Sequence, residues 1–154
     1  MKNILAIFLL LNSMLSIADT SRTKGWRGIV PLHSTRADVE RLLGPGTNEC
    51  QCGYYLDDVN VFFNYSPGDC KSGRGAWDVP LNTVVWITVH PKPHPKLSDL
   101  DIDENKFKKR PGGHIEGLIY YVNEEEGLTL LVSEGRVQTF LYGPSAKDKH
   151  LRCQ

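Results

Sequence analysis

The chain has 154 residues, which is the length of one globular domain. Its 40% apolar and 23% charged residues lie near the average for folded proteins, which excludes a disordered chain and a collagen-like repeat. Because 18 lysines and arginines balance 18 aspartates and glutamates, no overall field attracts nucleic acid or an anionic membrane. We therefore expect one soluble domain without a nucleic-acid partner.

The first 18 residues have the pattern of a secretory signal peptide. Lys2 gives a positive start, Ile4 to Leu11 is apolar, and Ser16 and Ala18 are small residues at the positions that a signal peptidase reads. The apolar run is too short to span a bilayer, so we expect no membrane span. We predict cleavage after Ala18, leaving residues 19–154 as a single secreted or periplasmic domain.

A short helix is predicted after residue 34. Thr35 can cap it, and Asp38 stands at the third helical position, where a capping box places a carboxylate. Gly44 and Pro45 are typical of a helix end. The predicted apolar face consists of Val39, Leu42 and Leu43.

The segment around this helix also resembles known families. Pro31–Pro45, with the sequence PLHSTRADVERLLGP, is similar to the opening signature of small outer-membrane assembly lipoprotein modules of the SmpA/OmlA type and of beta-lactamase inhibitory protein repeats. The resemblance implies a helical layer on an antiparallel sheet and a function in protein binding. The pattern from Trp26 to Cys153 is also similar to secreted bacterial proteins without an established function.

Alternating apolar residues predict strands in the rest of the chain. In the third of them, Val85, Ile87 and Val89 are expected to share one face. Asp103 can cap one further helical turn that ends at Lys108. The fold class is thus α+β, a short helical layer on an antiparallel sheet of about five to six strands, stapled by disulfides. The predicted strands are Tyr54–Leu56, Val59–Tyr65, Val84–His90, Leu118–Val122, Leu128–Val132 and Val137–Tyr142.

Four cysteines in an exported chain indicate disulfides. Direct pairing of Cys50 with Cys52 would close a very tight loop, so the two other pairings are favoured. Of these we prefer Cys52 with Cys70, and Cys50 with Cys153. A redox or metal pair is the alternative, but Cys50-Gln51-Cys52 lacks the two-residue spacer of such motifs.

No metal or cofactor site is predicted, although two patterns come close to one. Asp99, Asp101 and Asp103 have the spacing of the first three ligands of a calcium loop, but the glycine and the final glutamate of that loop are missing. His90 and His94 lie four residues apart in an extended, proline-rich segment, where they do not share a face.

No catalytic residues are predicted either, because the nucleophile motifs are absent. His114 and Glu116 lack the paired cysteines of a zinc deaminase. Asp57 and Asp58 are adjacent on a turn and point apart. Asn64 begins an Asn-Tyr-Ser glycosylation sequon, whose use depends on the host.

The leading hypothesis is a non-catalytic protein-interaction module of the cell envelope or extracellular space. Its candidate anchors are Trp77 in the loop Ser66–Val79, and Trp86 and Phe62 if the second face of the sheet is open. In the alternative, the segment Pro91–Gly113 covers these aromatics. A second hypothesis is an envelope hydrolase or metal-dependent enzyme that uses His90, His94 or His114, and a third is a small-ligand pocket between helix and sheet. The expected partner is a protein or another component of the cell envelope.

Overall fold

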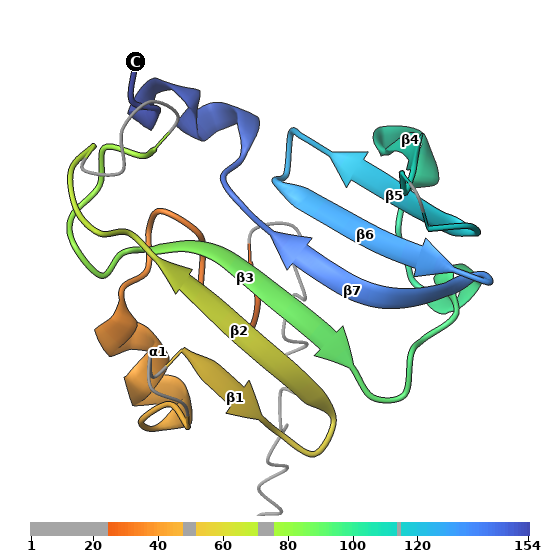
Figure 1. Cartoon of the computed structure of the whole chain (residues 1–154), viewed down its shortest axis with the longest axis horizontal. Coiled ribbons are helices and arrows are strands. Elements are labelled where there is room, and N and C mark those ends of the chain that lie inside the picture. Colours follow the sequence, from red (N-terminus) through yellow and green to blue (C-terminus); the bar gives the residue numbers. More distant parts are fainter. Residues whose placement is uncertain (1–24, 48–51, 71–75, 114) are drawn as a thin grey trace, which may run out of the picture.

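A computed structural model describes residues 25–47, 52–70, 76–113 and 115–154. The expected signal segment and its cleavage after Ala18 lie outside the described residues. The described part contains one α-helix, seven strands and three short 3-10 helices, arranged as one antiparallel sheet (Figure 1). In chain order these are α1 (Arg36–Leu43), β1 (Gly53–Tyr55), β2 (Val59–Tyr65), β3 (Val84–Pro91), η1 (Leu97–Asp99), η2 (Glu104–Lys106), β4 (Lys108–Pro111), β5 (Leu118–Asn123), β6 (Leu128–Ser133), β7 (Arg136–Tyr142) and η3 (Ala146–Leu151).

The predicted helix forms where the capping signals place it. In α1, the Thr35 side chain accepts from the Asp38 N–H, and the Asp38 carboxylate accepts from the Thr35 N–H. Val39 is fully buried, and Leu43 packs against the same core. Leu42 is 46% exposed, so the prediction that it faces the core is wrong. With only two turns, α1 covers the sheet through one narrow stripe.

The strands follow the order β1-β2-β3-β7-β6-β5-β4, and all neighbours are antiparallel. Strands β2 and β3 pair through seven residue pairs, whereas β3 and β7 pair through three. Figure 1 shows that β3 and β7 diverge toward the arrowhead of β3. The sheet therefore consists of two half-sheets joined at a short central seam.

Two apolar clusters lie on one face of this sheet, the core face. The first gathers under β1 to β3 with Val39 of α1, and the second under β5 to β7 with Leu97 and Phe107. Phe140 and Tyr142 of β7 contact both clusters, which they connect across the seam. The core is continuous for this reason, although the helical layer is small.

The sheet has one strand more than expected, and the molecule is mostly β. The predicted turn after Asp103 is present, and Phe107 is buried as its anchor, but the turn ends at Lys106. Residues Lys108–Pro111 then extend along β5 as β4. All four residues of β4 are exposed, so no apolar alternation marks it in the sequence.

A register shift in β3 explains a second difference. Tyr65 pairs with Val84, and Asn64 with Trp86, which leaves Val85 as the extra residue of a β-bulge. Val85 joins a third cluster, with Leu32 and Val79, instead of the cluster that holds Ile87 and Val89. The prediction that these three β3 residues share one face is therefore wrong for Val85.

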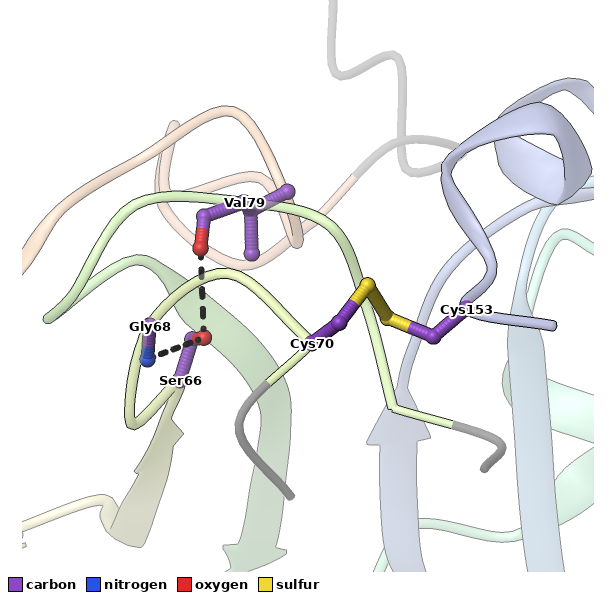
Figure 2. Close-up of a disulfide and its surroundings, with 5 residues drawn as sticks. All are labelled: Ser66, Gly68, Cys70, Val79 and Cys153. Atoms are coloured by element: carbon purple, nitrogen blue, oxygen red, sulfur yellow. Dashed lines mark hydrogen bonds between the residues drawn. A yellow bond between two sulfur atoms is a disulfide. The ribbon is translucent and has the colours of Figure 1, made fainter. Parts of the chain in front are cut away.

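The structure corrects the favoured disulfide pairing. Cys70 is bonded to Cys153, with the Cα atoms 5.6 Å apart (Figure 2). Both favoured pairs are therefore wrong. Cys52 is also disulfide-bonded, while Cys50 lies outside the described residues.

The position of the C-terminal segment explains the pairing of Cys153. It runs along the loop that carries Cys70: the Asp78 N–H donates to the Leu151 carbonyl at 2.7 Å, and the Cys153 N–H donates to the Ala76 carbonyl at 2.9 Å. In the same loop, Ser66 Oγ accepts from the Gly68 N–H at 3.0 Å and contacts the Val79 carbonyl (Figure 2). The loop and the chain end thus form one bonded unit.

Within the described residues, no helix is long and apolar enough to cross a membrane.

Candidate binding surface

The second face of the sheet is not covered by α1, η1 or the Phe107 segment. We call it the open face. Neighbouring strand residues point to opposite faces, so Phe62, Trp86 and His90 point away from the core clusters. The side chains of α1, η1 and the Phe107 segment that join the core all join it on the other face.

A row of contacting side chains crosses the open face from β1 to β7. The Tyr55 and Phe62 rings meet edge to face with centroids 5.8 Å apart, and Phe62 meets the His90 ring in the same manner at 5.9 Å. His90 Nδ1 lies 3.0 Å from Thr139 Oγ1. We call these four residues the aromatic row. Its outer end is accessible, since Tyr55 is 61% exposed.

Trp86 lies next to this row and is fixed by a glycine. A methyl group on Gly143 would overlap with the six-membered ring of Trp86, so the indole packs directly on the backbone that follows β7. Trp86 nevertheless stays 39% exposed. A large aromatic that is both held in place and accessible is typical of a binding anchor, because little conformational entropy is lost on contact.

The charged residues of the strands are all basic. None of the seven strands contains an aspartate or a glutamate. Lys109 of β4 lies over the Tyr121 ring on the core face, so its neighbours Lys108 and Arg110 point to the open face. Both approach Glu124, at 3.9 and 3.3 Å. One carboxylate thus faces two cations at this edge of the surface.

Both edges of the sheet are poor templates for another strand. At one edge β1 has three residues, and at the other β4 consists of two lysines, an arginine and Pro111. Short edge strands, lysines and proline are features that oppose edge-to-edge pairing. The accessible apolar surface of the sheet is therefore its face and not its edges.

The three aromatic residues predicted as anchors lie in two different places. Trp77 is half-buried against the Leu32 cluster, and the Arg152 guanidinium lies 5.6 Å from its ring centre. Trp77 is therefore a packing residue. Phe62 and Trp86 point to the open face instead. The segment Pro91–Gly113 does not cover them, because its buried residues Leu97 and Phe107 pack on the core face.

The histidines of the alternative enzyme hypothesis lie in different settings. His90 belongs to the aromatic row, whereas His94 is an exposed loop residue whose carbonyl accepts from Arg136 at 2.9 Å. His114 lies outside the described residues. In the part of the chain that the structure describes, no three histidine, cysteine or acidic side chains gather to hold a metal.

The acidic residues that the sequence analysis named form caps and single contacts. Asp103 caps η2 by accepting from the Asn105 N–H, and Asp99 contacts its neighbour Ser98. Asp58 pairs with Arg27 at 2.9 Å, which ties the β1–β2 turn to the segment before α1. Asn64 is exposed on the open face beside Trp86.

Tyr55 and Thr139 are members of the surface that sequence reasoning missed. The signal for Tyr55 was available, because Tyr54 is buried and adjacent strand residues alternate.

Comparison with known proteins found no matching family model, no matching curated protein and no matching solved structure.

Proposed function

We propose that this chain is an exported, non-catalytic binding domain of the cell envelope or extracellular space. Its open face binds another protein, one that presents apolar side chains flanked by acidic residues. The observation that carries the proposal is the accessible aromatic surface around Tyr55 and Trp86 on a sheet whose edges are protected.

Charge supports an acidic partner. The strands supply no carboxylate of their own, and Lys108 and Arg110 share Glu124 at the β4 end. An acidic group on a partner can therefore approach without meeting a like charge on the strands. Complementary charges at the rim of an interface chiefly raise the association rate and select the partner.

Two further observations support export and binding. The disulfide between Cys70 and Cys153 is compatible with an oxidising compartment. The resemblance of Pro31–Pro45 to families that act by protein binding agrees with this, although here the helical layer is reduced to α1.

Site-specific photocrosslinking tests the proposal. A photoreactive phenylalanine derivative replaces Tyr55 in the disulfide-bonded protein, which is irradiated with envelope and medium fractions of the source cells. The control position is Leu81, which is 62% exposed in a loop and matches the 61% exposure of Tyr55. We expect one protein adduct from position 55 and none of that mass from position 81.

Two substitutions then test the chemistry of the captured partner. Lys108→Glu and Arg110→Glu are expected to lower the adduct yield, and raising the salt concentration should do the same, because exposed charges are screened. Equal adducts from positions 55 and 81, or no adduct from position 55, would contradict the proposal. If charge reversal leaves the adduct yield unchanged, the acidic character of the partner is contradicted, but the binding function of the open face is not.

A further inference from the structure

A cavity of about 530 Å³ lies beyond the end of β7. Its walls come from the segment Val30–His33, the β5–β6 turn at Glu125 and Glu126, and the chain from Gly143 to His150. This volume falls in the range of small-ligand sites, roughly 300–1,000 Å³. None of the lining residues belongs to the aromatic row, and Gly143 is the lining residue that also contacts Trp86.

Hydrogen bonds between the walls hold the cavity open. The Gly143 N–H donates to the Gly127 carbonyl at 2.7 Å, and the Ala146 N–H donates to the Glu124 carbonyl at 2.9 Å. On the opposite side, His33 Nε2 lies 3.1 Å from Asp148 Oδ1, although the two residues are 115 positions apart. The three walls are thus fixed to one another before any ligand arrives, which lowers the entropy cost of binding.

The serine, carboxylate and histidine in the wall are not arranged as in a serine hydrolase. Asp148 Oδ2 accepts from the N–H of Ser145 at 2.8 Å and from its hydroxyl at 2.7 Å, while Oδ1 faces His33. The carboxylate therefore stands between the serine and the histidine. In a nucleophilic triad the histidine occupies that middle position and takes the serine proton. Ser145, Asp148 and His33 therefore do not form a nucleophilic triad.

The charge that lines the cavity is negative. Glu125, Glu126 and Asp148 oppose Lys147, so with both lining histidines neutral the formal charge is −2. The hydrogen bonds from Ser145 and His33 hold the pKa of Asp148 below its usual value against the opposing effect of burial. That carboxyl is ionised at neutral pH.

The two glutamates of the turn are incompletely neutralised. Glu125 is exposed and forms no ion pair within the described residues, and Glu126 Oε1 has only Lys106 at 4.0 Å. A negative field in a concave site raises the local concentration of cations. Beside these charges, Val30 and Pro31 provide apolar wall.

We infer that this cavity binds an organic cation with an apolar stem, an alkylammonium group whose charge faces Glu125 and Glu126 and whose methylene chain lies along Val30 and Pro31. The same chemistry is offered by a free amine and by the lysine side chain of a protein.

Nuclear magnetic resonance titration of the full disulfide-bonded chain tests the inference. The probe is n-hexylammonium, and the matched controls are hexanoate and 1-hexanol, which keep the stem and change only the charge. We expect saturable shifts of the backbone amides of His33, Glu126 and Ser145 with the amine. Equal shifts with hexanoate or hexanol, or shifts spread over the whole chain, would overturn the inference.

Charge removal in the wall supplies the second test. Glu125→Gln is expected to weaken amine binding about fivefold, the value of one charge contact near 4 Å in water. Glu126→Gln should act in the same direction. The control is Glu134→Gln in the exposed β6–β7 turn, which should leave binding unchanged. Unchanged affinity in both Glu125→Gln and Glu126→Gln would overturn the role of the turn.

The source of the cation is distinguished by a second probe, a pentapeptide with one central lysine between glycines, compared with its norleucine analogue. Binding of n-hexylammonium alone identifies a small free amine. Lysine-dependent binding of the peptide identifies the side chain of a protein. Either result supports the inference, whereas the failure of both probes overturns it.

Discussion

The indole of Trp86 rests on Gly143, a contact that leaves no space for a side chain at position 143. Gly143→Ala is therefore expected to destabilise the fold by about 1–3 kcal/mol, the usual cost of overpacking. Urea unfolding measures the loss. In a Trp86→Ala background the same substitution should cost clearly less, because the clash is gone. An equal cost in both backgrounds would show that Trp86 does not occupy this position.

The disulfide closes a loop that spans about half of the chain. Cys70 and Cys153 are 83 positions apart, so the chain-entropy model gives a stabilisation of roughly 4–5 kcal/mol. We expect the double variant Cys70→Ser with Cys153→Ser to unfold at much lower urea concentration than the native protein. Peptide mapping without reductant provides the independent check. A fragment that joins Cys52 to Cys70 would contradict the structure.

Acid should loosen the link between the two ends of the described chain. The lowered pKa of Asp148 arises from its bonds to Ser145 and His33, which outweigh the effect of burial. Because this folded-state pKa lies below the ordinary value of 3.8, the stability it provides is complete above about pH 4 and is lost as the pH falls through the folded value.

We therefore expect Asp148→Asn to flatten the decline of stability below pH 4, as measured by urea unfolding across pH 2 to 6. The exposed Asp101→Asn is the matched control and should keep the native decline. A decline of unchanged steepness in Asp148→Asn would mean that another carboxyl carries the acid sensitivity.

Two neighbouring positions of α1 should differ sharply in cost. Val39 is fully buried and Leu42 is 46% exposed. We expect Val39→Ala to cost about 1–3 kcal/mol through the lost apolar contacts and the cavity left behind, and Leu42→Ala less than about 0.5 kcal/mol. Thermal and urea unfolding of the two variants measure this difference. Similar losses would place both residues in the core.

Local signals in the sequence predicted much of the fold. The Thr35 and Asp38 spacing located α1, and strict alternation located six of the strands. Alternation failed for β4, because each of its residues is exposed and the strand forms by pairing with β5. It also failed at Val85, where a bulge in the tertiary structure changes the face.

Long-range relationships were not accessible in the same way. The cysteine spacing led to two wrong pairs, because it contains no information on the path of the C-terminal segment beside Ala76. The cavity depends on His33 and Asp148, which are 115 positions apart. The contact between Ser145 and Asp148 was nevertheless predictable, because these two residues have capping-box spacing. The open face was predicted as one of two alternatives, and the placement of Phe107 decided between them.

The protected edges restrict how the sheet can associate with other chains. A strand that joins a sheet at its edge becomes the new edge and can recruit the next strand, so that kind of association has no natural end. With β1 cut to three residues and β4 crowded with cations, this route is blocked on both sides. Binding across the face, as proposed, would add no strand to the sheet, so it would not create a new edge from which fibres could grow.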